Sequence, residues 1–212
     1  MKIVILANGQ FPSHNIPLQL LQQADRLICC DGALNQLISH NAYNPQQSLS
    51  VIGDGDSIDS SMRARFKDSF IHVADQNTND LTKAMSLCTP SQTTSVDIVG
   101  ATGLRDDHNL ANISLLADYS VQYPFPVRMV TDFGIFTPIN TTTTFKSFPR
   151  QQVSIFPFDF SAVLTYEGLE YPITNTSLTR LWQGSLNASL GDSFTVKVNH
   201  GPVLVYQTYD PK

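Results

Sequence analysis

In the first 130 residues, short apolar runs alternate with segments in which apolar residues recur every three or four positions. The apolar runs predict strands at 3–6, 26–30, 50–53, 70–74, 96–100 and 127–130. The segments between them predict helices at 17–23, 31–40, 57–67, 79–88 and 107–120. Strands that are apolar on both faces and are joined by helices are typical of parallel sheets. The pattern therefore predicts a three-layer α/β domain with a mostly parallel sheet.

The pattern changes after about residue 132, where long helical periods end. Stretches rich in β-favouring residues follow, broken by Pro, Gly and Asn, at 141–148, 152–158, 162–171, 193–199 and 202–209. Such stretches indicate a small all-β sandwich or barrel. We therefore expect two domains, with residues 1–132 forming the α/β domain and residues 133–212 the β domain.

Composition limits the classes of function. The chain has 212 residues, a net charge of −5 and 13 Lys and Arg that are scattered, which argues against a general nucleic-acid binder. No window approaches the roughly 18 apolar residues of a membrane helix, and the start lacks the long apolar run of a signal peptide. Three cysteines in apolar surroundings predict buried thiols in a reducing compartment. We expect a cytoplasmic protein without nucleic-acid or membrane partners.

Several predicted strands end in Gly, Asp or Asn. These polar ends are Asn8-Gly9, Asp31-Gly32, residues 53–56, Asp75 and residues 100–103. Open α/β sheets bind ligands outside the carboxyl ends of their strands, so we expect these ends to meet at one crevice. The crevice should be acidic.

Asp54 and Asp56 are separated only by Gly55. Glycine accepts backbone angles that other residues avoid, so both carboxylates can point at one ion. Without compensation they would repel each other, and Mg²⁺, which prefers oxygen ligands, would relieve that repulsion. Taken alone, the stretch fits an Asp-Gly turn or a helix N-cap at Ser57 equally well.

Asp80 and Lys83 are three residues apart at the start of a predicted helix, so they share one face. An exposed ion pair with Asn79 or Thr78 as the cap is the commoner structure for this spacing. The position after a strand favours instead a site for a metal-bound polyphosphate. Asp31, which follows another strand, fits either a helix N-cap or a residue that supports metal ligands.

Gly100 and Gly103 leave a predicted strand in a tight turn. Backbone N–H groups of such a turn can cradle phosphate, and the Thr102 hydroxyl can assist, although the sequence matches no established Gly-rich nucleotide motif. Arg105 is placed to bind a phosphate or carboxylate with two N–H groups. Asp106 or Asp107 can cap the next helix, and His108 is more often a structural hydrogen-bonding residue than a base.

The β-rich half contains polar and aromatic residues close together in the sequence. They are Tyr171, Asn175, Trp182, Ser185 and Asn187. Core packing is the commoner role for the aromatic side chains. The alternative is a stacking platform for a flat heteroaromatic cation.

In order and spacing these segments resemble the thiamine pyrophosphokinase family. The matching segments are DGA at 31–33, IGDGDS at 52–57, DQ…D..KA at 75–84, GATG.R.DH at 100–108, LANI at 110–113 and GLEYP.TN at 168–175. The resemblance implies a nucleotide-binding α/β domain that carries catalysis, here 1–132, and a thiamine-binding β domain, here 133–212. It implies transfer of a pyrophosphoryl group from ATP to the hydroxyl of thiamine, giving thiamine diphosphate and AMP, with Mg²⁺ and with the site at a homodimer interface.

The resemblance also assigns roles residue by residue. Asp54, Asp56 and Asp80 would ligate Mg²⁺, and with Lys83 and Arg105 they form the catalytic set. The ATP site would further include Asp31, Gln76, Thr102, Gly103, Asp107 and His108. Ser185 and Asn187 would lie near thiamine. The chain departs from the family pattern at Asn79, Leu104 and Leu186, where Thr, Gly and Ser are usual.

Two alternatives remain at this point. One is the same chemistry with another alcohol as acceptor, such as a hydroxymethyl pterin, against which Asn187 and the stretch 168–175 argue. The other is a non-catalytic sensor of nucleotide or thiamine, which would have no need of four aspartates at the sheet edge.

Overall fold

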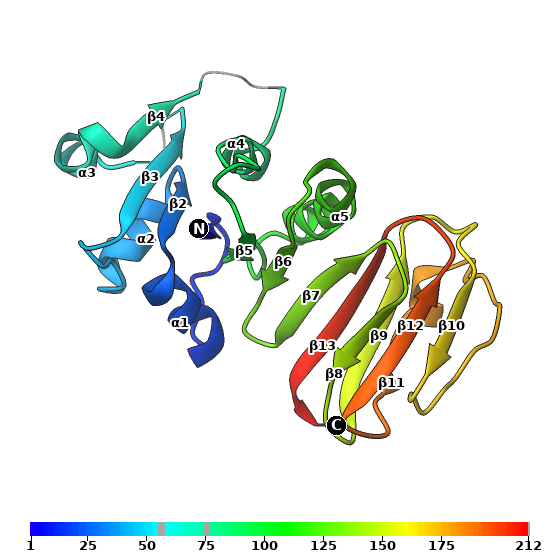
Figure 1. Cartoon of the computed structure of the whole chain (residues 1–212). Helices are drawn as coiled ribbons and strands as arrows, with labels where there is room; N and C mark the ends of the chain where they lie inside the picture. Colours follow the sequence, from blue (N-terminus) through cyan, green and yellow to red (C-terminus); the bar gives the residue numbers. More distant parts are fainter. Residues whose placement is uncertain (55–57, 74–76, 212) are drawn as a thin grey trace. The chain divides into compact units, whose positions relative to one another are not determined.

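The computed structural model describes residues 1–54, 58–73 and 77–211 (Figure 1). The chain divides into two compact units, Met1–Ile113 with Phe125–Asp132, and Ser114–Pro124 with Phe133–Lys212. We call them the α/β unit and the β unit. The segment 114–124, which is the second half of a long helix, groups with the β unit although it precedes residue 133 in the sequence.

The α/β unit contains a sheet of parallel strands. They are β1 (Lys2–Leu6), β2 (Arg26–Cys30), β3 (Ser48–Gly53), β4 (Phe70–His72), β5 (Ser95–Val99) and β6 (Val127–Val130). Their order in the sheet is β4-β3-β2-β1-β5-β6, and each neighbouring pair is parallel. The last four residues of β1, β2 and β5 are all buried, which explains their continuous apolar runs. The predicted parallel sheet is confirmed.

Helices connect these strands. They are α1 (Asn15–Gln23), α2 (Ala33–Ser39), α3 (Ser60–Arg65), α4 (Asp80–Ser86) and α5 (Asp106–Gln122), with a short 3-10 helix η1 at Lys67–Ser69. In Figure 1, α1, α2 and α3 lie on one side of the sheet, and α4 and α5 on the other. Helix α1 starts before the predicted residue 17 because the Nδ1 atom of His14 accepts a hydrogen bond from the Ile16 N–H at 3.2 Å.

The β unit contains two antiparallel sheets. One has the order β11-β9-β13-β7, with β7 (Gly134–Ile139), β9 (Gln151–Pro157), β11 (Asn187–Ala188) and β13 (Val203–Pro211). The other has the order β10-β12-β8, with β8 (Thr143–Lys146), β10 (Leu164–Glu167) and β12 (Ser193–Val198). The sequence pattern missed β7, which contains Pro138, and the two-residue strand β11. Pairing with β13 and β9 defines these two strands.

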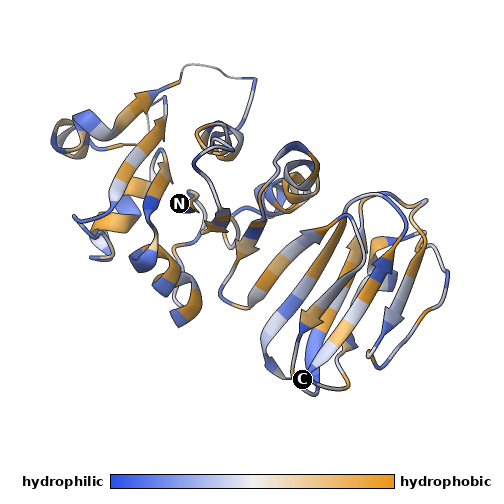
Figure 2. Ribbon diagram, in the orientation of Figure 1, coloured by the Kyte–Doolittle hydropathy of each residue, from blue (hydrophilic) through white to orange (hydrophobic). Residues whose placement is uncertain are grey.

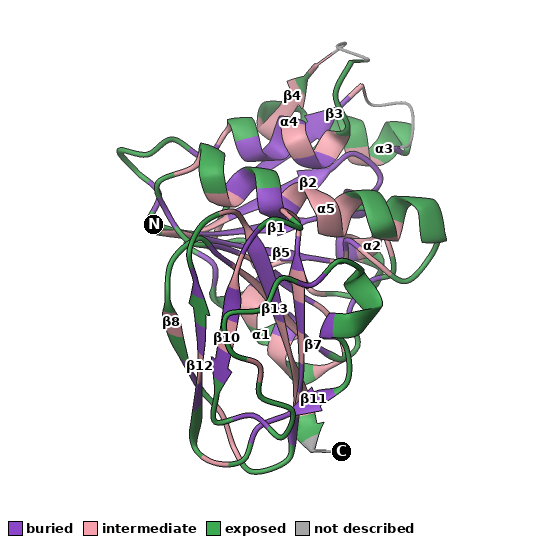
Figure 3. Cartoon of the chain, turned by 90° about the vertical axis from the view of Figure 1, so that its right-hand side faces the viewer, coloured by how far each residue is buried: buried purple, intermediate pink, exposed green. Residues whose placement is uncertain are grey.

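Burial is continuous along strands such as β1 in the α/β unit, but it alternates along strands of the β unit. Along β9 buried and half-buried residues alternate, as expected for a strand with one face on a core. Apolar and polar colours alternate along the β unit's strands in Figure 2, and burial is mapped in Figure 3. The core of this unit includes Val153, Ile155, Leu164, Phe194 and Val205.

All three cysteines are buried free thiols, as the sequence predicts. In the part of the chain that the structure describes, the helices are too short or too polar to cross a membrane.

Candidate functional site

A cavity of about 430 Å³ lies in the α/β unit, beyond the carboxyl ends of β1, β2, β3 and β5. Strand β1 is the topological switch point of the sheet, because β2 to β4 follow on one side of it and β5 and β6 on the other. Loops diverge at such a point and leave a crevice. Five of the predicted site residues line this cavity: Asp54, Asp80, Lys83, Arg105 and His108.

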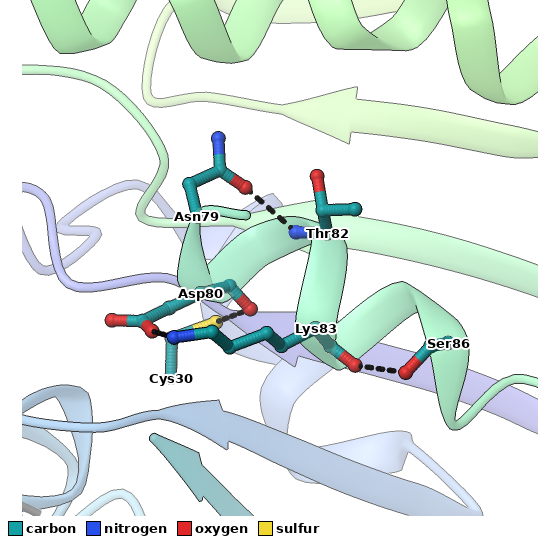
Figure 4. A network of polar contacts seen from close by, with 6 residues as sticks. All are labelled: Cys30, Asn79, Asp80, Thr82, Lys83 and Ser86. Atoms are coloured by element: carbon teal, nitrogen blue, oxygen red, sulfur yellow. Dashed lines mark hydrogen bonds and ion pairs between the residues drawn. The ribbon is translucent and has the colours of Figure 1, made fainter. Parts of the chain in front are cut away.

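Asp80 and Lys83 form an ion pair inside this cavity (Figure 4). Helix α4 begins here because the side chain of its N-cap, Asn79, accepts a hydrogen bond from the Thr82 N–H at 2.8 Å. One turn later the Lys83 Nζ donates to the Asp80 Oδ1 at 3.1 Å. The Lys83 side chain is 7% exposed and that of Asp80 is 41% exposed. The pair is therefore not the wholly exposed one that the spacing also allows.

Cys30 also lines the cavity, which the sequence did not predict. Its thiol donates to the Asp80 backbone carbonyl at 3.6 Å, as Figure 4 shows. Burial raises the pKa of the Cys30 thiol well above its ordinary value, the charges of Cys29, Asp80 and Asp31 add to the rise, and Lys83 opposes it. Cys30 is therefore a protonated thiol in the wall of the cavity.

Asp31 is buried beside the end of β3, outside the lining of the cavity. Its backbone φ is +37°, and its N–H donates to the Ile52 carbonyl at 2.8 Å. A Cβ atom added at Gly53 would lie 2.7 Å from the Asp31 Cβ, so only glycine fits at this strand end. The N-cap of α2 is Gly32, so the N-cap interpretation of Asp31 is wrong.

Two predicted carboxylate ligands, Asp54 and Asp80, line the same cavity. Asp56, Gln76 and Ser57 lie outside the described residues, and the N-cap of α3 is Asp59. Within residues 1–54, 58–73 and 77–211, no group of three or more His, Cys, Asp or Glu is arranged to hold a metal. The oxygen donors that are described match the preference of Mg²⁺.

The turn after β5 packs against the loop after β1. The Gly9 N–H donates to the Gly100 carbonyl at 2.7 Å and the Gln10 N–H to the Thr102 carbonyl at 2.9 Å. Gly103 has a φ of +97°, and its N–H donates to the Asn109 Oδ1 at 3.0 Å. Thr102 and Gly103 therefore lie outside the lining, which Ala101 and Leu104 form in their place.

Arg105 is held by Asp107. Its Nε donates to the Asp107 Oδ1 at 3.1 Å and its terminal nitrogen to Oδ2 at 2.6 Å. The Asp107 Oδ1 also accepts the His108 N–H at 3.0 Å. The hydrogen bond from Arg105 is the main cause that lowers the pKa of Asp107, and the same bond raises the pKa of Arg105. Asp107 thus orients Arg105 without lining the cavity itself.

Four asparagines line the cavity: Asn8, Asn79, Asn109 and Asn112. The sequence pattern indicates Asn8 as a strand end at the crevice and Asn79 as a possible helix cap, but it assigns no role to Asn109 or Asn112. The Asn112 Nδ2 donates to the Ala101 carbonyl at 2.8 Å, and the Asn8 Oδ1 accepts from the Gln36 Nε2 at 3.0 Å. The available signals were the position of Asn8 after β1 and that of Asn112 four residues beyond His108.

A second cavity, of about 390 Å³, lies within the β unit and contains both predicted thiamine-side residues, Ser185 and Asn187. Its lining has no charged residue among the described ones. The Asn187 Oδ1 accepts the N–H of Tyr171 at 3.0 Å and that of Ala188 at 2.9 Å, and its Nδ2 donates to the Tyr171 carbonyl at 2.8 Å. The Ser185 hydroxyl donates to the Trp182 carbonyl at 2.7 Å. Both side chains therefore hold the backbone around the cavity.

The prediction that the side chains of Tyr171 and Trp182 pack in the core is wrong. Trp182 is 73% exposed and Tyr171 is 58% exposed. Trp182 lies on the 3-10 helix η2 (Leu181–Gly184), outside the lining, whereas Tyr171 lines the second cavity. Helix η2 contacts β9 so closely that a Cβ atom at Gly184 would lie 1.7 Å from the Ile155 carbonyl oxygen.

Two family models match the chain. Residues 18–127 match the catalytic domain of thiamin pyrophosphokinase, and residues 134–206 match the substrate-binding domain of thiamin pyrophosphokinase. A thiamine pyrophosphokinase of Bacillus subtilis (strain 168) is 28% identical over 139 residues, which are 62% of this chain and 64% of that protein. The chain thus aligns with less than two thirds of that relative.

Solved structures of thiamine pyrophosphokinases share the fold. The enzyme from Bacillus subtilis superimposes with a TM-score of 0.80 at 22% identity, covering 99% of this chain and 100% of that one. The enzyme from Candida albicans superimposes with a TM-score of 0.82 at 17% identity, covering 99% and 90%. The expected fold, an α/β domain followed by a small β domain, is confirmed.

Proposed function

Because the chain belongs to the thiamin pyrophosphokinase family, we propose that it transfers a pyrophosphoryl group from ATP to the hydroxyl of thiamine, giving thiamine diphosphate and AMP. In this proposal, residues 1–132 bind ATP with Mg²⁺ and contain the catalytic residues, and residues 133–212 bind thiamine. As in the resemblance, the protein acts as a homodimer with the active site at the interface.

One observation carries the proposal. Asp54, Asp80, Lys83 and Arg105 come from three segments of the chain, separated by up to 51 residues in sequence, yet all line the cavity at the switch point of the sheet. Two carboxylates, a buried ammonium and a guanidinium in one lining match a triphosphate with a divalent cation. A nucleotide site is also the usual occupant of this position in an open α/β sheet.

The residues of this chain stabilise charge and fix geometry. In the transfer, the oxygen of the thiamine hydroxyl loses its proton to a carboxylate of the site or to water and attacks the β-phosphorus. The bond between that phosphorus and the AMP oxygen breaks, AMP leaves, and negative charge grows on the phosphoryl and leaving oxygens. The Lys83 ammonium and the Arg105 guanidinium stabilise that charge. Asp80 fixes Lys83 and Asp107 fixes Arg105, so both cations are oriented before the substrate binds.

Asp54 and Asp80 would hold Mg²⁺, with Asp56 added from the resemblance and Asp31 buried close by. The carboxylate oxygens fit this ion. When bound, Mg²⁺ neutralises phosphate oxygens and lowers the repulsion that an attacking oxygen meets. His108 lines the same cavity, and Gln76 is added from the resemblance to complete the proposed ATP site, whereas Thr102 and Gly103 lie outside the lining.

The test is an assay of the purified full chain with Mg·ATP and thiamine, with all products separated by chromatography. Equal amounts of AMP and thiamine diphosphate are expected. Product formation with a hydroxymethyl pterin but not with thiamine would show that the acceptor is a pterin alcohol. Binding of both substrates without any product would make the protein a sensor.

A further inference from the structure

The loops after β1 and β5 use several of their backbone N–H groups on each other. Those of Ala7, Gly9 and Gln10 donate to carbonyl oxygens of β5 and of the turn after it, at 2.9, 2.7 and 2.9 Å. The Gly103 N–H donates to the Asn109 Oδ1. These four groups are therefore not available to a phosphate, although loops of this kind often cradle one. A polyphosphate in the charged cavity then depends more on donors from side chains.

The side chain of Asn79 offers such a donor. Asn79 lines the charged cavity, and its Oδ1 accepts the Thr82 N–H at 2.8 Å. A backbone N–H only donates, so the oxygen of the amide must face Thr82 and the nitrogen must face elsewhere. Figure 4 shows the Asn79 oxygen turned toward Thr82 and its nitrogen turned away.

Gln36, on α2, fixes the orientation of Asn8 in the same way. The Gln36 Nε2 donates to the Gly9 carbonyl at 3.1 Å and to the Asn8 Oδ1 at 3.0 Å. Because a carbonyl only accepts, the Gly9 contact requires the nitrogen of Gln36, and the second N–H of that nitrogen requires the oxygen of Asn8. Asn8 lines the cavity, whereas Gln36 lies outside the lining.

The amide nitrogens of Asn8 and Asn79 donate no hydrogen bond among the residues that the structure describes. The other two asparagines of the lining bind the turn after β5 instead: Asn109 accepts from Gly103, and Asn112 donates to Ala101. Asparagine amides can donate to phosphate oxygens. Unlike a further lysine or arginine, a neutral amide adds no positive charge that would repel a divalent cation.

We propose that the amide nitrogens of Asn8 and Asn79 donate hydrogen bonds to phosphate oxygens of the nucleotide, and that Gln36 is a positioning residue that keeps the nitrogen of Asn8 turned toward the cavity. The inference rests on the proposed function for the identity of the ligand. None of the three residues belongs to the ATP site that the resemblance implies, and Asn79 replaces a Thr that is usual in the family. This chain thus has phosphate donors of its own.

The first experiment removes the two donors and measures binding by calorimetry without thiamine. The probes are Mg·ATP and inorganic tripolyphosphate with Mg²⁺. Asn8→Ala and Asn79→Gly should each raise Kd about tenfold for both probes, because one hydrogen bond to a charged oxygen is lost. Glycine is chosen at position 79 because it replaces an asparagine N-cap at little cost to the helix. A loss for Mg·ATP alone would overturn the contact with phosphate.

Gln36→Glu tests the positioning. A carboxylate only accepts, so the Asn8 amide should turn its nitrogen toward it and away from the cavity. Kd for Mg·ATP should rise about tenfold or more in the parent background. In the Asn8→Ala background the same substitution should add less than about threefold, because no amide is left to turn. Gln36→Met, which removes the donor without adding charge, serves if Gln36→Glu does not fold. Independent effects of the two substitutions would overturn the role of Gln36.

Gln47→Met is the structural control. The Gln47 Nε2 also donates to two backbone carbonyls, those of Leu21 and Ala24, at 2.8 and 2.9 Å, but Gln47 lies outside the lining of the charged cavity. This variant should melt at a lower temperature than the parent and bind both probes with unchanged Kd. A rise in Kd equal to that of Gln36→Met would show that the effect comes from general loss of stability, and would overturn the positioning role.

The binding measurements need no acceptor substrate, so the outcomes separate the two proposals. Nucleotide binding that depends on Asn8 and Asn79, without any thiamine diphosphate in the assay, overturns the proposed function alone. Formation of thiamine diphosphate with unchanged Kd in Asn8→Ala and Asn79→Gly overturns the present inference alone. A parent protein that binds neither Mg·ATP nor tripolyphosphate overturns both.

Discussion

The two cavities of this protein differ in whether their linings carry charged side chains. The cavity of the α/β unit has Asp54, Asp80, Lys83, Arg105 and His108 in its lining, whereas the described lining of the β-unit cavity has no charged residue. In the first, Lys83 pairs with Asp80, and Arg105 pairs with Asp107 just outside the lining. In the second, polar side chains bind the backbone and leave an apolar wall. The charged lining and the uncharged lining thus come from different kinds of sheet.

The difference follows from the sheets. A parallel sheet with a switch point gathers loops at one edge, where carboxylates and cations can face a common space. An antiparallel sandwich buries one face of each strand, so a cavity near its core is surrounded by alternating apolar side chains. Substitutions in the first cavity should therefore act on turnover, and substitutions in the second on stability and on acceptor binding.

The largest effect is expected for Asp54→Asn, which keeps the size of the side chain and removes its charge. The loss of one carboxylate at the proposed metal and phosphate site should lower kcat/KM by about 100-fold or more. Unfolding in urea checks that the variant is folded. Asp118→Asn, an exposed change on α5, is the control. Activity of Asp54→Asn within about threefold of the parent would remove Asp54 from the catalytic set.

Asn187→Ala tests the other cavity. Three hydrogen bonds to the backbone of Tyr171 and Ala188 would be lost at a residue that is 7% exposed. Leaving buried backbone groups unpaired should lower the free energy of unfolding by about 2–3 kcal/mol. Urea titration measures it. Ser185→Ala should cost less, because its one bond lies at an exposed position. An equal loss in the free energy of unfolding for the two variants would show that burial of these hydrogen bonds does not determine their contribution.

Asp80→Ala tests how much the ion pair with Lys83 contributes to the free energy of unfolding. It leaves the Lys83 ammonium, whose side chain is 7% exposed, without its carboxylate. Since Asp80 itself is 41% exposed, solvent weakens the pair, and we expect a loss of about 1–2 kcal/mol in the free energy of unfolding, less than for a fully buried pair. Asp107→Ala, which breaks a wholly exposed pair, should cost less. A larger loss for Asp107→Ala would show that burial does not govern these pairs.

The smallest effect concerns acid stability of the α/β unit. The Asp132 carboxylate accepts hydrogen bonds from the N–H and hydroxyl of Ser13 and from the N–H of His14. Partial burial opposes ionisation, but these bonds prevail and lower the pKa of Asp132 below its ordinary value of 3.8. The ionised form therefore adds stability above pH 3.8, and that contribution disappears as the pH falls through the lower folded-state pKa.

Asp132→Asn should thus weaken the protein at pH 7 and narrow the difference in stability between pH 7 and pH 3, by less than about 1 kcal/mol. Thermal melts at the two pH values measure it. An unchanged pH dependence in the variant would show that Asp132 titrates at the same pH in the folded and unfolded chain.

Strands β1, β2 and β5 of the α/β unit could be predicted because each ends in four buried residues within a continuous apolar run. The rule that ligands bind at the carboxyl ends of such strands brought Asp54, Asp80 and Lys83 into one cavity. The rule fails for Gly103, whose N–H is taken by Asn109. Hydrogen bonds within the turn decide that, and the sequence pattern does not record them.

In the β unit the sequence is less informative. Strand β11 has two residues and exists through pairing with β9. The burial of Tyr166 and the exposure of Trp182 depend on which segment closes the sandwich, not on the residue types. A contact made by tertiary packing cannot be derived from the local pattern alone.

The most direct test of the central claim is to follow the β-phosphate of ATP. The purified protein is incubated with thiamine, Mg²⁺ and ATP that carries ³²P only at the β position, and the products are separated. If a pyrophosphoryl group is transferred, all transferred label will be in thiamine diphosphate and an equal amount of unlabelled AMP will form. Label that stays in ADP, with thiamine monophosphate as the product, would contradict it, because a single phosphoryl group would then have moved.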